Sequence, residues 1–231
     1  MTSTSIERWQ IFRIGLIALC ISGVMGVLAK NLLLHEPDSR TAKAKKEYKF
    51  PDTINLKNWE MVKSLSIPPK KKSQPFGHLY EYRRGDKELQ IQTRYEVATE
   101  GNTSRLLMVY DSIPPATSVI NEKYQSGIGY YGSFEYKNKT YITACINPKG
   151  ETTVTQKQFV NNRYWHTSSV PRFLGWLAGQ NDLFDGRCLW TSLSMPVNTF
   201  APPEELKKDR ELVEAAWLEW AKWWKQNYPD S

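Results

Sequence analysis

The chain has 231 residues, of which 40% are hydrophobic and 24% are charged, and its formal net charge is +7. This balance excludes a wholly disordered protein, and the length suits one ordinary domain with appended segments. The three cysteines and three histidines are isolated, and neither a zinc-ligand spacing nor a P-loop, GxSxG or HExxH motif is present. We therefore expect no metal, no cofactor and no enzyme of those motif classes.

An apolar stretch runs from Ile14 to Ala29 without a charged residue. As a helix it would be about 24 Å long, short of a hydrocarbon core of roughly 30 Å. Snorkelling of Arg13 and Lys30 would let residues 11–34 span the membrane. We predict a short segment at 1–13 and a transmembrane anchor at 14–34. The alternatives are a core helix and a signal peptide cleaved after Ala29, although three leucines beyond that site favour the anchor.

Residues 35–49 form a basic linker with five lysine or arginine residues and three acidic residues. It is interpreted as a solvated spacer close to lipid headgroups, so we expect a membrane and no nucleic acid as a partner. More lysine and arginine residues follow the apolar stretch than precede it, and the positive-inside rule alone would place the following domain in the cytoplasm. Long translocated domains weaken that rule, so charge leaves the orientation open.

Residues 50–231 have the pattern of one α+β domain with an antiparallel sheet. Alternating runs on both sides of Gly85 and Asp86 predict a hairpin, and a second hairpin is expected to turn at 137–139. Further strands are expected at 105–111, at 152–160 and in the run closed by Pro196, and a short helix at 170–179.

The final element is predicted to be a long amphipathic helix from Pro203 to Asn227, which contains four tryptophans within eight positions. Four exposed tryptophans would form an apolar patch of roughly 600 to 1,000 Å², more than soluble monomers usually show. At 100° per residue one narrow stripe is expected to pack on the sheet, and Trp223 lies about 80 to 100° away from it, where we expect it to be more exposed and to contact a partner. The stripe is Val213, Trp217, Trp220 and Trp224.

Two readings are open for the cysteines outside the apolar stretch. Cys145 and Cys188 each lie in a predicted strand, and in an exported domain they would form a disulfide; otherwise they are separate buried thiols. Cys145 with His166 is also a conceivable nucleophile and base, but two structural residues are the favoured interpretation. Arg163 and Arg187 are expected to satisfy carbonyl groups or acids rather than bind a substrate.

The motif "INPKGETTVTQKQFVNNRYWH", followed by "RCLWTSLSMP" and "AWLEWAKWW", resembles the cyanoexosortase A system-associated proteins of cyanobacteria. The resemblance covers most of the chain, including the apolar stretch and "FPDTINLKNWE", whereas "IPPKKKSQPFGH" departs from it. Its motifs are structural and not catalytic. The matching residues are Asn147, Pro148, Gly150, Phe159, Asn162 and Arg163 in the first motif and Arg187, Cys188, Leu189, Trp190 and Thr191 in the second.

The resemblance implies a non-enzymatic accessory protein, anchored in the plasma membrane beside a multipass exosortase with its domain on the extracytoplasmic side. Such a protein would assist substrate presentation or the stability of the complex. Two other functions remain alternatives. One is a module that binds exported polysaccharide through Tyr130, Tyr131 and Trp165, and the other is a thiol enzyme that uses Cys145.

Overall fold

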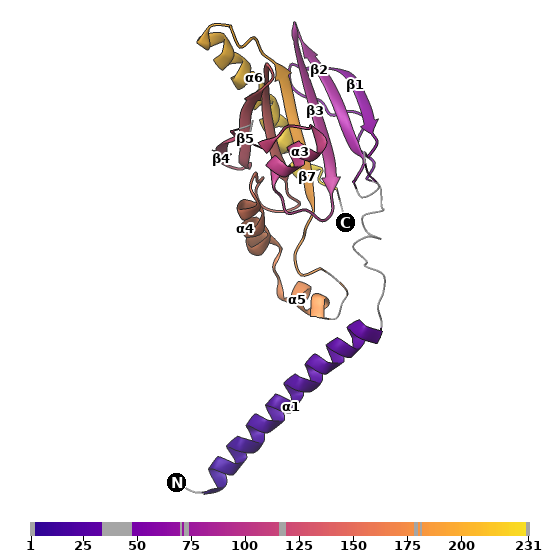
Figure 1. Ribbon diagram of the computed structural model, residues 1–231, viewed down its shortest axis with the longest axis vertical. Coiled ribbons are helices and arrows are strands. Elements are labelled where there is room, and N and C mark those ends of the chain that lie inside the picture. Colours follow the sequence, from indigo (N-terminus) through magenta and orange to yellow (C-terminus); the bar gives the residue numbers. More distant parts are fainter. Residues whose placement is uncertain are drawn as a thin grey trace. The chain divides into compact units, whose positions relative to one another are not determined.

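The computed structural model describes residues 3–33, 48–69, 71, 74–115, 119–177, 180 and 182–229. The chain divides into two compact units, Met1–Lys43 and Ala44–Ser231 (Figure 1). Residue 34, most of the predicted 35–49 linker, and Gly179, the expected end of a short helix, lie outside the described residues.

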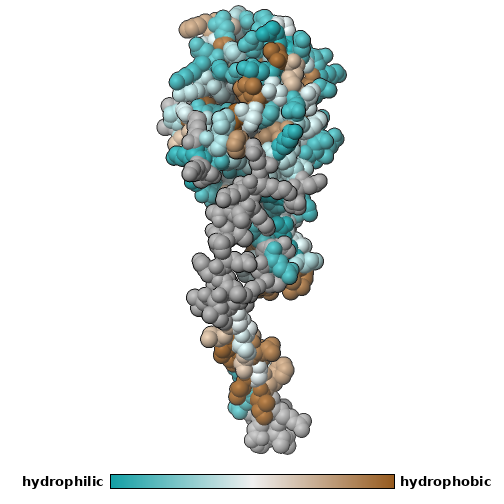
Figure 2. All heavy atoms as spheres, turned by 90° about the vertical axis from the view of Figure 1, so that its right-hand side faces the viewer, coloured by the Kyte–Doolittle hydropathy of each residue, from teal (hydrophilic) through white to brown (hydrophobic). Residues whose placement is uncertain are grey.

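The described part of the first unit is helix α1 (Ser3–Leu33). Its 18-residue window Trp9–Gly26 is long and apolar enough to cross a membrane, and none of it is buried by protein. Figure 2 shows hydrophobic side chains along this helix, whereas the surface of the second unit in that view is mostly hydrophilic. By length and composition α1 suits a membrane anchor, although a signal sequence near an N-terminus shares these properties.

The second unit is built on one seven-stranded sheet in which every pair of neighbouring strands is antiparallel, as predicted. The strand order is β1-β2-β3-β7-β6-β5-β4. The bounds are β1 (Glu60–Ile67), β2 (Gly77–Arg84), β3 (Lys87–Glu96), β4 (Asn121–Gln125), β5 (Gly129–Tyr136), β6 (Lys139–Ile146) and β7 (Cys188–Pro196).

Both predicted hairpins are confirmed. The β2–β3 turn contains Gly85 at φ +60°, and the β5–β6 turn places Lys137 and Asn138 at φ 47° and 57°. Positive φ at both central residues is typical of the two-residue turn whose twist matches the flanking strands. The central strand β7 is buried from Cys188 to Met195, because both faces of the sheet are covered there.

In the described part of this unit the sheet is accompanied by α3 (Thr103–Tyr110), α4 (Gln156–Thr167), α5 (Val170–Leu177) and α6 (Pro203–Gln226). In Figure 1, α6 lies behind the sheet and α3 in front of it, so the sheet is the middle layer of three. The larger core lies between the sheet, α6 and the segment around Phe50 and Trp59. The smaller core lies under α3 and includes Phe159, Trp190 and both sheet cysteines.

The expected strand at 105–111 is wrong, because this segment is helix α3. Asn102 caps the helix by accepting a hydrogen bond from the Arg105 amide, and Leu106, Leu107 and Tyr110 are buried on one side. A short apolar run is compatible with either a strand or a buried helix, and the cap decides between them here.

The expected strand at 152–160 is also mostly wrong. Thr152 and Thr153 form only isolated bridges, and α4 then begins at Gln156. Thr155 and Gln158 form a capping box, in which each side chain bonds the other residue's backbone amide. This Thr-x-x-Gln spacing is a helix-start signal that outweighs the β-branched residues before it.

Helix α6 buries the stripe expected to face the sheet. Val213, Trp217, Trp220 and Trp224 are fully buried, whereas Trp223 is half-buried at the edge of the same core. The Trp220 ring packs edge-on against Tyr80 at 5.2 Å, and its Nε1–H donates to the Thr191 hydroxyl at 3.4 Å. The wide aromatic arc of this helix is therefore covered by the protein itself.

Candidate functional site

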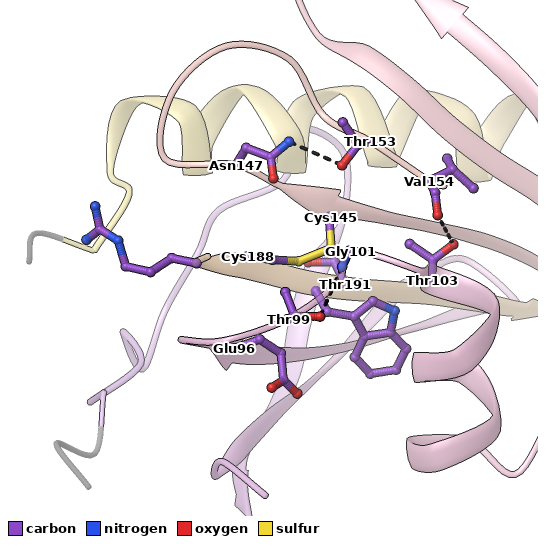
Figure 3. Close-up of a disulfide and its surroundings, with 12 residues drawn as sticks. Glu96, Thr99, Gly101, Thr103, Cys145, Asn147, Thr153, Val154, Cys188 and Thr191 are labelled. Atoms are coloured by element: carbon purple, nitrogen blue, oxygen red, sulfur yellow. Dashed lines mark hydrogen bonds between the residues drawn. A yellow bond between two sulfur atoms is a disulfide. The ribbon is translucent and has the colours of Figure 1, made fainter. Parts of the chain in front are cut away.

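The central disulfide joins Cys145 of β6 to Cys188 of the neighbouring β7 (Figure 3). The sulfur atoms are 2.01 Å apart, and both residues are fully buried. Cys145 therefore has no thiol in this structure, and His166 lies exposed at the end of α4. The geometry does not bring these two residues together as a nucleophile and a base.

The loop that carries Asn147, Pro148 and Gly150 is fixed by side-chain amides. Asn147 donates to the Glu151 carbonyl at 2.6 Å and to the Thr153 hydroxyl at 3.2 Å, the second of which is drawn in Figure 3. Asn162 of α4 accepts from the Glu151 amide at 2.9 Å and donates to the Lys149 carbonyl at 2.8 Å. These bonds attach the loop after β6 to α4.

Glycine is required in this loop for two reasons. Gly150 has φ +77°, and a Cβ at that position would lie 2.2 Å from Oδ1 of Asn162. The amide of Asn162 therefore occupies space that any other side chain at position 150 would need. The two motif residues form one joint between the loop and the helix.

Phe159 and Arg163 lie one turn apart on α4. Phe159 is buried beneath Gly101, whose φ is +70° and whose added Cβ would lie 2.2 Å from the Phe159 ring. The Arg163 guanidinium stacks over the rings of Phe159 and Phe184, 4.9 and 5.9 Å from their centroids. Burial lowers the pKa of Arg163. Among the described residues its contacts are these ring faces, and the charge of Asp185 acts against the effect of burial on its pKa.

Arg187 does bind an acid. Its Nε and Nη2 groups donate to the two carboxylate oxygens of Asp185 at 2.9 and 2.7 Å, and Nη1 donates to the Tyr95 hydroxyl at 3.4 Å. Burial alone would raise the pKa of Asp185, but the hydrogen bonds and charge of Arg187 hold that pKa below its ordinary value. The two side chains form a bidentate ion pair directly before the first residue of β7.

The other motif residues of β7 alternate between the two cores. Leu189 contributes to the α6 core, whereas Trp190 lies under α3 and donates through Nε1 to the Thr143 hydroxyl at 3.1 Å. Thr191 accepts the Trp220 hydrogen bond already described. The resemblance residues thus converge on the end of the sheet where β6 finishes, β7 begins and α4 is attached. We call this region the stapled end.

A buried polar cluster beneath α3 escaped the sequence analysis. Arg94 is 1% exposed, its guanidinium carbon lies 4.3 Å above the Tyr110 ring, and Nη1 donates to the Pro75 carbonyl at 2.8 Å. The Tyr110 hydroxyl donates to Glu96, and burial raises the pKa of Glu96 and lowers that of Arg94. Gly77 makes room, because a Cβ there would lie 2.9 Å from the guanidinium carbon.

One sequence signal pointed to this cluster. Arg94 and Glu96 occupy alternate positions of β3 and therefore share one face of the strand. With 105–111 assigned to a strand, the sequence offered no helix to cover this face. The cluster connects α3 to β3 through Tyr110, whose ring contacts Arg94 and whose hydroxyl contacts Glu96.

The surface beyond the stapled end is apolar. Helix α5 contains no buried residue, and it adjoins an open groove of about 520 Å³ between α4, α5 and the Leu183–Phe184 segment. The neighbouring Trp165 on α4 is 84% exposed. We call the following exposed set the α5 apolar surface: Tyr164, Val170, Phe173, Leu174, Trp176 and Leu177.

The other aromatic candidates are dispersed. Tyr131 is buried beside Trp217 and donates to Glu214, Tyr130 is half-buried against Tyr124, and only Trp165 is freely exposed. They do not form a shared platform for a sugar ring. Trp223, the expected partner contact, packs edge-on against Trp224 at 4.9 Å and keeps part of its ring exposed.

Two features that a partner could contact are the α5 apolar surface and the edge of Trp223, both on a domain with a buried disulfide. Within the described ranges, no group of three or more histidine, cysteine, aspartate or glutamate residues is placed to hold a metal ion. Compared with protein-family models, curated proteins and solved structures, the chain matches none.

Proposed function

We propose that this chain is a membrane-anchored, non-enzymatic accessory protein of an exosortase-type protein-sorting system. The observation that carries the proposal is the role of the resemblance residues. Asn147, Gly150 and Asn162 join a loop to a helix, Arg187 pairs with Asp185, and Cys188 forms a disulfide. Residues that brace a surface in this way suit a docking protein.

The proposed location is the extracytoplasmic side of the plasma membrane, with α1 as an uncleaved anchor. Two features support it. The apolar window of α1 is long enough to cross a bilayer, and disulfides between buried cysteines persist mainly in oxidising compartments. An anchor in the same membrane as the partner would raise the effective concentration of the domain near that partner, without any additional contact between them.

Purification from native membranes tests this function. An affinity-tagged full-length chain, solubilised in mild detergent after brief crosslinking, should retain a multipass exosortase-type protein. Trp223→Ala should weaken that retention, because the partly exposed ring is the expected contact, while the exposed neighbouring change Lys222→Ala should leave it unchanged.

Two outcomes would contradict the proposal. Failure to recover any multipass membrane protein under these conditions would remove the accessory role. Retention of exported polysaccharide by the tagged chain, with no protein partner, would favour the glycan-binding function instead.

A further inference from the structure

The apolar side of helix α5 is exposed, and two of its residues, Val170 and Phe173, line the open groove. At 100° per residue Val170, Phe173, Leu174 and Leu177 fall within about 100° of one another, whereas Arg172 and Gly175 lie on the opposite side. The Arg172 Nε group donates to the Asp182 carbonyl at 3.1 Å, which attaches that opposite side to the domain. Core-facing helices bury their apolar side, whereas none of the residues of α5 is buried.

The chemistry of the surface is that of a lipid–water boundary. The apolar side of α5 consists of three aliphatic residues and one phenylalanine. Tyr164 and Trp176 lie beside it with their rings partly exposed. Tryptophan and tyrosine favour the headgroup level of a bilayer because one part of each ring system is apolar and another part donates hydrogen bonds. Helices with an apolar side and a polar side lie in this boundary with the apolar side buried in it.

The length of the chain between the two units limits the distance of the domain from a bilayer that α1 spans. Fourteen residues separate Leu33 of α1 from Tyr48. Even a fully extended chain of that length reaches only roughly 50 Å, so an α1 that spans a membrane keeps the domain near the surface. The intervening sequence includes Arg40, Lys43, Lys45 and Lys46, which anionic headgroups attract.

We propose that the α5 apolar surface inserts into the headgroup region of the membrane that α1 spans. This inference rests on the proposed anchoring, because a helix of two turns would bind lipid only marginally by itself and needs the tether as its second attachment. Insertion orients the domain, with the stapled end at the bilayer and the loop between β7 and α6 away from it. Figure 1 shows α5 and that loop at opposite ends of the domain.

Lipid quenching of a site-specific fluorophore tests this orientation. The full-length chain carrying Cys20→Ser and Leu174→Cys is labelled with a small fluorophore under non-reducing conditions, which keep Cys145 and Cys188 paired. It is then reconstituted in vesicles of equimolar phosphatidylcholine and phosphatidylglycerol that contain a lipid with a nitroxide near its headgroup. The matched control carries the label at Phe200→Cys, since Phe200 is an aromatic residue 94% exposed in the loop before α6.

We expect the label at position 174 to lose most of its emission to the nitroxide lipid and the label at 200 to lose little. Adding Phe173→Ser and Leu177→Ser should abolish the quenching at 174, while thermal unfolding stays unchanged because both side chains are exposed. Equal, weak quenching at both positions overturns the proposal. Shielding of position 174 only when a membrane protein partner is added also overturns it and assigns the surface to protein.

The vesicles contain no exosortase, so this result is independent of the proposed accessory role. Weak quenching at 174 combined with successful recovery of an exosortase-type partner would refute lipid docking alone. Failure of the labelled chain to float with the vesicles would instead refute the anchoring on which both proposals depend.

Discussion

Single residues at the stapled end show how this domain keeps charge beside its core. Asp185 is buried and Arg187 is mostly buried. Arg187 donates hydrogen bonds to both carboxylate oxygens of Asp185 and to the Tyr95 hydroxyl. Removing one member of such a pair leaves the other charge buried and unpaired, which costs far more than the net value of the pair. The stability of the segment before β7 therefore depends on whether the Asp185 carboxylate is ionised.

We predict that Asp185→Asn makes the domain less stable at neutral pH and less sensitive to acid. The pKa of Asp185 is lower in the folded protein than in the unfolded chain, so its contribution is complete above the unfolded value, about 4. That contribution is lost as the pH falls through the lower, folded value. At pH 7 the free energy of unfolding of the Asp185→Asn variant should be lower by about 3 kcal/mol, near the lower limit for breaking a buried pair.

Thermal unfolding of the full-length chain in detergent between pH 7 and pH 3 measures both effects. The exposed Asp182→Asn is the matched control and should follow the parent at every pH. The quantity to compare is the difference in free energy of unfolding between variant and parent, because other carboxylates titrate in the same range. A difference that stays constant from pH 7 to pH 3 would show that the pair contributes nothing to acid sensitivity.

The sequence predicted some residue roles better than others. Once the cysteine in the apolar stretch is set aside, Cys145 and Cys188 are the only pair left, so their bond could be anticipated for an exported domain. Arg94 could not be placed, since its burial depends on Pro75, Gly77 and Tyr110, which come from separate parts of the chain. Periodicity shows which side chains lie on the same face of a strand, but it does not show which element covers that face.

Among the elements, α6 is attached to the sheet by apolar and charged contacts together. Its four-residue stripe fills the larger core, while Lys87 bonds Asp209 at 2.8 Å and Lys123 bonds Glu214 at 2.7 Å on either side. The ion pairs fix the register of the helix on the sheet, and the tryptophans supply most of the buried area. We therefore expect the four-residue stripe to contribute more to the free energy of unfolding than the ion pairs do.

We predict that Trp217→Ala and Trp220→Ala each lower the free energy of unfolding by about 3 to 5 kcal/mol, the usual cost of deleting a buried aromatic side chain. Trp220→Ala also removes the donor to Thr191. Trp223→Ala should cost clearly less, because that ring is only half-buried. Urea unfolding of the full-length chain in detergent, followed by near-ultraviolet circular dichroism, gives the three values. Parent-like midpoints for both buried positions would refute this account of the helix.

Element type was predictable where two signals agreed. The hairpins had alternation plus a turn, and α6 had prolines, acidic residues and a tryptophan stripe, so each was assigned correctly. Strands β1 and β4 were missed because they lie at the sheet edges with largely exposed side chains and little alternation. Segments 105–111 and 152–160 were misassigned because local composition was given more weight than the capping residues Asn102 and Thr155.

For the whole molecule, two physical arguments about topology oppose each other. The basic residues that follow the apolar helix favour a cytoplasmic domain by the positive-inside rule. The buried disulfide between β6 and β7 favours an oxidising compartment, because thiols in the cytosol are kept reduced. The charge rule is weakest for long translocated domains, and the disulfide closes a loop worth roughly 4 kcal/mol by chain entropy.

We therefore predict that the domain lies outside the cytoplasm and stays attached to an uncleaved α1. Protease added to sealed, right-side-out spheroplasts should digest the domain, while a cytoplasmic marker protein stays intact until lysis. Mass analysis of the membrane-bound chain should recover peptides from before Ala29, which a cleaved signal would lack. Alkylation without reductant should label neither Cys145 nor Cys188 in the same preparation. Full protection of the domain until lysis, with both thiols open to alkylation, would show that the basic flank determines the topology and that the domain is cytoplasmic.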